Sequence, residues 1–415
     1  MTGRVPESGD NERIIILVTG ANRYFCLLFN LPQATLSTPK PTPRFTTNLP
    51  PAHGSGLGFS ICCRLADDFL RSNPASRTLT VIFTTRSSKK GSDTLRRLQE
   101  YLENSPVAKN GGESSKERVE FVPENVDLAN LLSVRALSRR VNSSFPKLDS
   151  IILNAGLGGW TGINWPLAIW SVLTDLVHAV SWPSFKIANA GVVTDPQTNL
   201  GSEEEPRLGA VFCANVFGHY MLAHNVVPLL RKSRDPNGPG RIIWVSSLEA
   251  TVKMFDVDDI QGLKTVAPYE SSKALTDVLT ITSELPSSAP WVRSFYSVDD
   301  NRTLGSESTS KPVADTDISA ENKPSMYLSH PGICGSGILP LTLPFFYLML
   351  SAFWLARMLG SPWHTVSTYL GACAPVWLAL SSQSTLDDAE APYLENGGGR
   401  VKWGSSCSRS GCEKP

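Results

Sequence analysis

Short aliphatic runs alternate with helix-forming segments along most of the chain, and this alternation is what most limits the fold. We expect strands at residues 14–18, 79–84, 119–122, 150–153, 242–245 and 326–328. We expect helices at residues 56–69, 93–102, 211–230 and 269–285. Strands that alternate with helices imply right-handed crossovers and a parallel sheet. The sequence therefore predicts an α/β fold in which a doubly wound parallel sheet carries helices on both faces.

The charge balance and the cysteines exclude some classes of function. The 415-residue chain has 38 basic and 38 acidic residues, so its net charge is zero. Because nucleic-acid phosphates bind basic surfaces, nucleic acid is not expected as a partner. The eight cysteines form no Cys-x-x-Cys pair and no metal-ligand spacing with histidine. We therefore expect reduced thiols, no metal site and a protein that faces the cytosol, since the polar N-terminus does not resemble a signal peptide.

Glycines follow the first predicted strand, as a dinucleotide-binding fold requires. They lie in the two strings Thr19-Gly20-Ala21-Asn22 and Ser55-Gly56-Leu57-Gly58. Glycines at such a turn let the backbone approach phosphates, which then sit at the N-terminus of the following helix. The strand before the turn and the helix after it favour a cofactor site in a Rossmann-like fold over two unrelated glycine turns.

Residues 23–54 interrupt this turn. The segment holds six prolines and no acidic residue. A Pro-rich insertion is physically awkward inside a phosphate loop, because the geometry of such a loop is tight. We interpret the segment as a retained intron or a gene-model error, in which correct splicing would leave one serine in place of Arg23 and Ser55. If the segment is real, it must loop out, and the cofactor affinity is then open.

The end of the second strand indicates which nicotinamide cofactor is used. An acidic residue there would bind the ribose 2′-hydroxyl of NAD. This chain instead has Thr85-Arg86-Ser87-Ser88-Lys89. An arginine followed by serines and lysines suits a 2′-phosphate. We therefore expect NADPH, and the alternative is a solvated basic loop.

A tyrosine and a lysine lie one helical turn apart at Tyr269 and Lys273, so their side chains share a helix face. A nearby ammonium stabilises a phenolate and lowers the pKa of the phenol from its ordinary value of about 10. The pair could then exchange a proton with a carbonyl or alcohol oxygen near neutral pH. Alone, Tyr-x-x-x-Lys is a weak signal, because any long helix can carry it by chance.

Together these motifs resemble the short-chain dehydrogenase/reductase superfamily. Without residues 23–54 the glycine turn reads Thr-Gly-Ala-Asn-Ser-Gly-Leu-Gly, which matches the superfamily's cofactor signature. The resemblance implies a catalytic tetrad of Asn215, Ser247, Tyr269 and Lys273. Tyr269 would protonate the carbonyl oxygen, and Ser247 would hydrogen-bond the same oxygen. Lys273 would lower the pKa of the phenol and hold the nicotinamide ribose, and Asn215 would kink its helix and seat a water.

Two points of this assignment stay open. Ser246 is the alternative to its neighbour Ser247. The spacing from serine to tyrosine is longer than usual, because residues 251–268 are inserted between them. We expect His219 and His330 to be structural residues with satisfied hydrogen bonds rather than catalytic bases.

The resemblance also implies a set of cofactor contacts in the turns after the strands. Asp127 would contact the adenine, and the Asn-Ala-Gly turn after the fourth strand would line the cofactor and steady the sheet. The Pro-Gly-Ile stretch after the sixth strand would contact the nicotinamide carboxamide. The full set is Thr19, Gly20, Asn22, Ser55, Gly56, Leu57, Gly58, Arg86, Ser87, Asp127, Asn154, Ala155, Gly156, Tyr269, Lys273, Pro331, Gly332 and Ile333.

Longer segments resemble the fungal 3-keto-steroid reductases of ergosterol synthesis, which are related to animal type 7 17β-hydroxysteroid dehydrogenases. The segments are residues 156–166, 207–220, 244–250 and 268–277. The resemblance implies NADPH-dependent reduction of the 3-keto group of a 4-demethylated sterol to the 3β-alcohol. It also implies work beside the other sterol C-4 demethylation enzymes, on the cytosolic face of the endoplasmic reticulum membrane or on lipid droplets.

Other functions remain as alternatives. One is reduction of another lipid ketone, such as a 17-ketosteroid or a retinoid. Another is a non-catalytic binding protein, if residues 23–54 disable the cofactor loop.

Composition divides the chain into three parts. Residues 1–335 form the predicted dehydrogenase/reductase domain, in which residues 297–323 are rich in polar residues and expected to be disordered. Residues 336–395 form an apolar region for substrate or membrane, and residues 396–415 a tail.

The apolar region suggests a lipid environment. No residue from Ile333 to Ala356 is charged, but Pro340 and Pro344 break the first half of this stretch. The remainder is short for a bilayer, which needs roughly 20 residues. We favour a monotopic or re-entrant membrane contact that draws sterol from the bilayer. A spanning helix and a pair of buried core helices are the alternatives.

Overall fold

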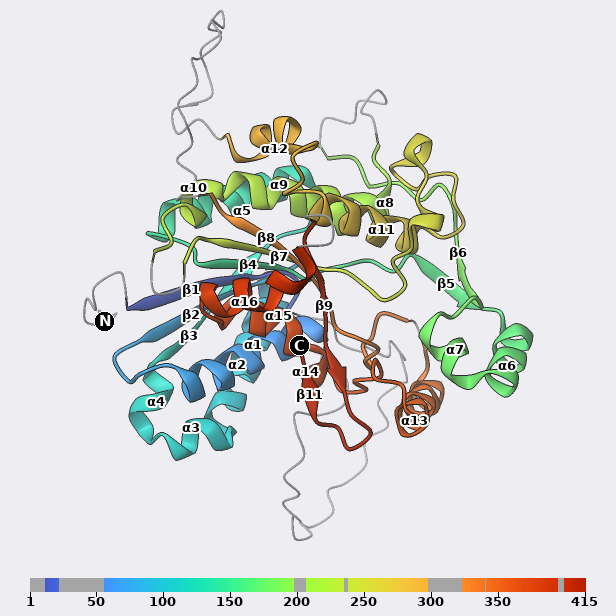
Figure 1. The fold of residues 1–415 in the computed structure, drawn as a ribbon, viewed down its shortest axis with the longest axis horizontal. Coiled ribbons are helices and arrows are strands. Elements are labelled where there is room, and N and C mark those ends of the chain that lie inside the picture. The colour runs from blue at the N-terminus through green and yellow to red at the C-terminus, as the bar shows by residue number, and fades with distance from the viewer. Residues whose placement is uncertain are drawn as a thin grey trace, which may run out of the picture.

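A seven-stranded parallel sheet forms the centre of the molecule (Figure 1). The computed structural model describes residues 12–21, 56–197, 207–234, 238–297, 323–339, 341–394 and 399–415. In spatial order the strands are β3 (Val119–Asn125), β2 (Thr78–Thr85), β1 (Arg13–Val18), β4 (Ser150–Leu153), β7 (Arg241–Val245), β8 (Ser325–His330) and β9 (Lys402–Gly404). The order changes direction at β1, which lies between β2 and β4, and such a switch point is where open α/β sheets bind their ligands. The predicted doubly wound sheet is confirmed.

Helices cover both faces of the sheet (Figure 1). One face carries α1 (Leu57–Ser72), α2 (Ser88–Asn104) and α15 (Cys373–Leu380). The other carries α5 (Leu131–Ser144), α9 (Gly218–Asn225) and α11 (Pro268–Ile281). Successive residues of β1 alternate between the two cores, because side chains on a strand point to opposite faces. The core beneath α1 receives Ile14, Ile16 and Val18, and the opposite core receives Ile15 and Leu17.

The helix predicted at residues 211–230 is divided. It consists of α8 (Ala210–Phe212), a π-helical turn at Cys213–Phe217, α9 and α10 (Val227–Leu230). Pro228 stands at the start of α10, where its missing N–H costs no helical hydrogen bond. The π turn is a widened helical turn of the kind often found at functional sites, and it contains Asn215.

The C-terminal third differs from the predicted division. Of residues 336–395, α13 (Leu343–Met358) is largely exposed, whereas α15 is buried between α1 and strands β7 and β8. Residues 402–404 are not a tail, because β9 pairs with β8 as the seventh strand. In the part of the chain that the structure describes, no helix is both long and apolar enough to cross a membrane.

Shorter elements complete the described fold. Two short antiparallel strands, β5 (Trp160–Ile163) and β6 (Lys186–Ala188), lie beside the carboxyl ends of the sheet strands (Figure 1). The chain between these two strands forms the helices α6 (Trp165–Thr174) and α7 (Leu176–Ser181). The remaining elements are α3 (Pro106–Asn110), α4 (Glu113–Glu117), α12 (Ala289–Tyr296), α14 (Thr368–Gly371), α16 (Gln383–Leu394), β10 (Ser406–Cys407), β11 (Glu413–Lys414) and 3₁₀ turns at Val252–Met254 and Val257–Asp259.

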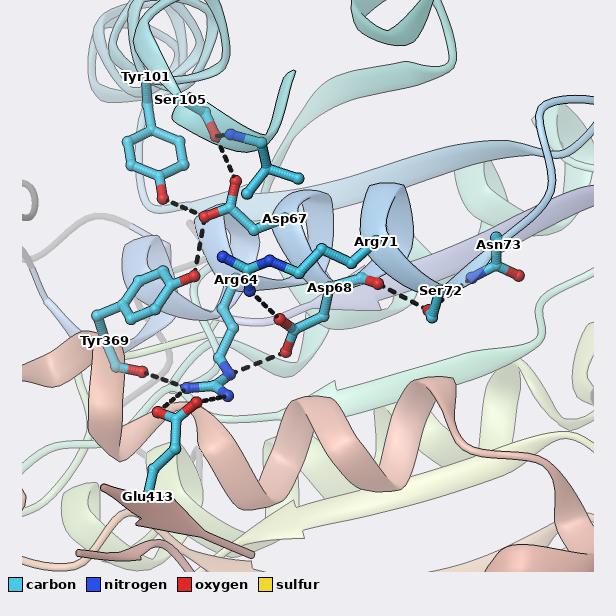
Figure 2. Close-up of polar contacts among 11 residues, drawn as sticks. Arg64, Asp67, Asp68, Arg71, Ser72, Asn73, Tyr101, Ser105, Tyr369 and Glu413 are labelled. Atoms are coloured by element: carbon cyan, nitrogen blue, oxygen red, sulfur yellow. Dashed lines mark hydrogen bonds and ion pairs between the residues drawn. The ribbon is translucent and has the colours of Figure 1, made fainter. Parts of the chain in front are cut away.

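A buried carboxylate ties α1 to distant parts of the chain (Figure 2). Asp67 accepts hydrogen bonds from the hydroxyls of Tyr101 (2.6 Å), Ser105 (2.6 Å) and Tyr369 (2.8 Å). One turn earlier on α1, Arg64 forms a bidentate pair with Glu413 at 2.5 and 2.6 Å. Because a charged acceptor makes stronger hydrogen bonds than a neutral one, Asp67 fixes α2 and the C-terminal region against α1.

We predict that Asp67→Ala lowers the free energy of unfolding by about 3 kcal/mol, because one buried and two part-buried hydroxyls lose their charged acceptor. Denaturant unfolding followed by circular dichroism measures this loss. The matched control is Asp93→Ala, which removes an exposed pair with Arg96 (2.9 Å) and should cost less than about 1 kcal/mol. Equal losses of unfolding free energy in the two variants would contradict the stabilising role of Asp67.

Candidate active site

A cavity of about 470 Å³ lies at the carboxyl ends of the central strands. Its wall includes residues that lie one or two positions after four of them: Gly20 after β1, Asn154 after β4, Ser247 after β7 and Pro331 after β8. The cavity therefore sits at the switch point of the sheet, where the fold class places its ligand. One end is polar and glycine-lined, and the other is lined by apolar side chains.

The two glycine strings of the sequence meet at this cavity. Gly20 has a positive φ of 75°, which favours glycine. A methyl group on Gly58 would lie 2.4 Å from the Gly20 carbonyl oxygen, so the two backbones are in contact there. The N-terminus of α1 begins at Leu57 beside this contact and lines the cavity.

This end of the cavity fits the phosphates of a dinucleotide. The glycine contact leaves no room for side chains, so the backbone can approach a ligand closely, and α1 presents its N-terminal amides. Gly56, Leu57 and Gly58 line it as predicted. Asn22 and Ser55, which belong to the same predicted set, lie outside the described residues, as do residues 23–54 and 298–322.

Thr19 connects the glycine turn to the Asn-Ala-Gly turn rather than facing the cavity. Its buried hydroxyl accepts hydrogen bonds from the backbone N–H groups of Asn154 (2.8 Å) and Ala155 (3.0 Å). The side-chain amide of Asn154 donates to the Thr19 carbonyl at 2.9 Å. Asn154, Ala155 and Gly156 line the cavity. The sequence motif thus steadies the sheet, as the resemblance implied.

The far polar end of the cavity is basic. Arg86 and Lys90 line it, next to Asp127 after β3. Ser87 does not line it, because its side chain caps α2 by accepting from the Lys90 N–H at 3.4 Å. Asp127 accepts from the Ala129 N–H at 3.0 Å, which fixes its turn at the rim. Arg86 is exposed and available to a ligand phosphate.

Tyr269 and Lys273 line the cavity from α11, on one face of the helix as their spacing predicted. The Lys273 Nζ lies 5.8 Å from the centre of the Tyr269 ring and donates to the Val245 carbonyl at 2.7 Å. Both side chains are buried. The indole of Trp160 packs on the phenol with ring centres 4.7 Å apart.

The two adjacent serines have different surroundings. The Ser246 hydroxyl donates a short hydrogen bond to Asp277, one turn beyond Lys273 on α11. The Ser247 hydroxyl instead accepts from the Glu249 N–H at 3.1 Å, and its residue lines the cavity. Ser246 lines the cavity as well. Because Asp277 already engages the Ser246 hydroxyl, the geometry favours Ser247 as the serine that contacts a substrate.

The inserted residues 251–268 do not separate the serine from the tyrosine. Asp259 accepts hydrogen bonds from the backbone N–H groups of Leu263, Lys264 and Thr265 at 2.8 to 3.0 Å, and so folds the insertion on itself. These three hydrogen bonds lower the pKa of the Asp259 carboxyl, although its burial opposes them. Ser247 and Tyr269 consequently reach the same cavity despite the long spacing.

Asn215 does not line the cavity but supports its wall. Its side chain accepts from the Leu157 N–H (2.6 Å) and donates to the Leu157 carbonyl (3.0 Å) and to the Ser272 hydroxyl (3.0 Å). The π turn at Cys213–Phe217 brings this amide to the strand-end loop. Asn215 is therefore placed beside the tyrosine helix, and its role in proton transfer stays a prediction.

Two histidines are structural, as expected. His219 contacts the Thr19 hydroxyl through Nε2 (2.9 Å) and the Asn215 carbonyl through Nδ1 (3.0 Å). His330 Nδ1 accepts from the Gly332 N–H at 3.2 Å. Burial lowers the pKa of both histidines to about 3, so they are neutral at physiological pH. The stretch Pro331, Gly332 and Ile333 lines the cavity.

Several residues of the site were not anticipated. Lys186, from β6, lines the cavity with Glu249 and pairs with it and with Glu270. Lys402, from β9, donates to the Ser247 carbonyl at 2.7 Å. No short motif marks these residues, because they come from separate elements. Asp277 could have been anticipated, because it lies eight residues after Tyr269 and therefore on nearly the same face of α11.

The second end of the cavity is apolar. It is lined by side chains from α7, α13 and the loop before α13, among them Val180, Leu339, Met349 and Phe353. Trp160 lies between this end and Tyr269, on whose ring it packs. The arrangement can place a flat apolar molecule against the phenol, with a polar cofactor at the opposite end.

Comparison with known proteins identifies the family. No family model matches the chain. A 3-keto-steroid reductase of Aspergillus fumigatus is 69% identical over 362 residues, which is 87% of this chain and 78% of that protein. The enzymes of the same name from Gibberella zeae and Schizosaccharomyces pombe are 38% and 32% identical, over 86% and 87% of this chain and 76% and 86% of those proteins.

Solved structures give weaker likenesses. Salutaridine reductase from Papaver somniferum is 17% identical with a TM-score of 0.40, over 78% of this chain and 88% of that one. The three reductases named above each match 86% or 87% of this chain. The chain therefore belongs to the family of fungal 3-keto-steroid reductases.

Proposed function

We propose that this protein reduces the 3-keto group of a 4-demethylated sterol intermediate to the 3β-alcohol in ergosterol biosynthesis, with NADPH as the hydride donor. The observation that carries the proposal is one cavity that joins the glycine turn, the Tyr269–Lys273 pair and an apolar pocket. The 69% identity to a 3-keto-steroid reductase supports the choice of a 3-keto sterol. The 2′-phosphate preference is supported by Arg86 and Lys90 at the cofactor end.

The residues of the chain divide the work of the reaction. A bound nicotinamide cofactor would supply the hydride. Tyr269 donates its phenolic proton to the ketone oxygen, and the positive charge of Lys273 favours the phenolate that remains. The Ser247 hydroxyl stabilises the charge that develops on the same oxygen. Trp160 and the apolar end of the cavity orient the ring system and exclude water.

We also propose that α6 and α13 dock on the cytosolic face of the endoplasmic reticulum membrane or on lipid droplets. Their outer faces expose Trp170 (68%), Leu173 (79%) and Leu348 (64%). The two helices meet where Trp165 packs on Phe345, with ring centres 4.5 Å apart. α13 also lines the apolar end of the cavity, so a sterol could pass from the bilayer to the site. Docking there would bring the protein beside the other C-4 demethylation enzymes.

We predict that Tyr269→Phe lowers kcat for a 3-keto sterol by about 10³-fold, because the general acid is lost. The dissociation constant for NADPH, measured by fluorescence titration, should stay within about twofold, since the phenyl ring keeps its contact with Trp160. Tyr220→Phe, on α9, is the matched control and should retain full turnover. The proposed mechanism fails if Tyr269→Phe still reduces the ketone.

The same assay distinguishes the alternative substrates. The ratio kcat/KM should be highest for the 3-keto sterol and lower for a 17-ketosteroid or retinal. A chain that binds no NADPH at all would instead support the non-catalytic alternative.

We predict that Arg86→Asp raises KM for NADPH by about tenfold or more and affects NADH much less, because a carboxylate repels the 2′-phosphate. Steady-state kinetics with the two cofactors measure the change. Arg96→Ala removes another exposed arginine, one that pairs with Asp93 and Glu100 on α2, and it should leave both KM values unchanged. An equal loss with both cofactors would argue against 2′-phosphate recognition.

We predict that Trp170→Glu with Leu173→Glu reduces binding to phosphatidylcholine–sterol vesicles by about tenfold or more, since two large apolar side chains no longer enter the bilayer. Vesicle flotation measures the bound fraction. The matched control is Trp291→Glu, an exposed tryptophan on α12 outside the residues that line the cavity. Undiminished flotation of the double variant would refute docking through α6.

A further inference from the structure

A buried lysine lies next to the catalytic tyrosine and is not part of the predicted tetrad. The side chain of Lys186 is only 3% exposed. Its Nζ forms a short ion pair with Glu249, lies 2.9 Å from Glu270 Oε1, and stands 3.9 Å from the centre of the Trp160 ring. Lys186 and Glu249 both line the cavity, so this charged cluster borders the site of reaction.

The three partners of Lys186 belong to three separate parts of the site. Trp160 is on β5, which pairs with β6 and carries the indole onto the Tyr269 ring. Glu270 directly follows Tyr269 on α11. Glu249 is in the loop after β7, and its N–H donates to the Ser247 hydroxyl at 3.1 Å. The Lys186 ammonium therefore connects the β5–β6 pair, helix α11 and the loop after β7.

A buried cluster of charges such as this one contributes little net stability to a fold. Burying an ammonium and two carboxylates loses their hydration, and well-packed apolar residues often give equal or greater stability. One carboxylate oxygen of Glu270 is buried without a hydrogen-bond partner among the described residues. Burial, opposed by Lys186 and assisted by Glu270, also raises the pKa of Glu249 to about 7. The cluster is thus better explained by where it places its neighbours than by a gain in stability.

We propose that Lys186 is a positioning residue for ketone reduction, whose ammonium fixes Ser247 and Tyr269 relative to each other and holds Trp160 against the phenol. This inference rests on the proposed function, since it requires that Tyr269 and Ser247 act on the same oxygen. A displacement of either group by a fraction of an ångström weakens both contacts to the developing charge. Lys186 therefore governs turnover rather than cofactor binding, because its contacts with Glu249, Glu270 and Trp160 involve neither the glycine turn nor the basic end of the cavity.

The test compares Lys186→Met with Lys186→Arg. Methionine keeps the apolar stem and loses the charge, whereas arginine keeps a cation that can bind both glutamates. We expect Lys186→Met to lower kcat for the 3-keto sterol by about tenfold or more, with the NADPH dissociation constant within about twofold of the wild-type value. Lys186→Arg should recover most of kcat. The matched control is Lys147→Met, which removes a buried lysine paired with Asp149 at 3.1 Å, outside the cavity wall.

The pH dependence of kcat provides a readout that a purely structural role would not move. The charged groups around Tyr269 are Lys273 and Glu270 on α11, Lys186 on β6 and Glu249 after β7. Loss of one cation raises the pKa of a phenol. The alkaline limb of the reduction should therefore shift to higher pH in Lys186→Met by about half a unit or more, and it should stay in place in Lys186→Arg and Lys147→Met.

A second variant covers the case in which Lys186→Met does not fold because two carboxylates lose their counter-ion. The triple variant Lys186→Met, Glu249→Gln and Glu270→Gln is neutral and nearly isosteric, and it should fold but keep the low kcat. Wild-type kcat and KM in either folded variant would overturn the inference, as would a matching loss of NADPH affinity. Failure of the wild-type protein itself to reduce a 3-keto sterol would instead overturn the proposed function, and the two failures are thus distinguishable.

Discussion

The hydroxyl of Thr19 is the contact on which the site depends. Its oxygen accepts from the Asn154 and Ala155 N–H groups, and its proton is free to bond to Nε2 of His219. His219 is then the tautomer with a proton on Nδ1, which donates to the Asn215 carbonyl. Every polar atom in this buried chain is satisfied, and the low pKa of His219 keeps it neutral. The glycine turn, the Asn-Ala-Gly turn and the π turn are consequently joined by one continuous set of hydrogen bonds.

The sequence predicts the sheet well, because β1, β2, β4 and β7 are buried on both faces and appear as continuous aliphatic runs. It fails where burial is one-sided or the element is short. α5 is missed because serines and arginines dilute its apolar positions, of which Val134, Leu137 and Val141 are buried. β9 is missed because three residues, Lys402–Gly404, have no strand pattern of their own. Their pairing with β8 is determined by tertiary structure alone.

The candidate site divides in the same way between local and long-range information. Tyr269 and Lys273 share a helix face at a fixed spacing, so the sequence alone places them together. The glycine contact is also predictable, and Gly20 and Gly58 touch although residues 22–55 lie between them in the chain. Lys186, Glu249 and Lys402 are not predictable in this way. Lys186 and Glu249 line the cavity, and Lys402 contacts the Ser247 carbonyl, because the β5–β6 pair, the loop after β7 and strand β9 come together at this end of the sheet.

The same long-range contacts explain why the hydroxyls of Ser246 and Ser247, two residues that both line the cavity, have different partners. Lys402 donates to both the Ser247 carbonyl (2.7 Å) and Asp277 (2.6 Å), and Asp277 in turn binds the Ser246 hydroxyl. On the other side, the Glu249 N–H donates to the Ser247 hydroxyl while Lys186 holds the Glu249 carboxylate. Two lysines, Lys402 from β9 and Lys186 from β6, thus hold the groups that bind the two serines. The Ser246 hydroxyl thus donates to a carboxylate that Lys402 holds, whereas the Ser247 hydroxyl acts as an acceptor, and this difference favours Ser247 as the serine that could donate to a ketone oxygen.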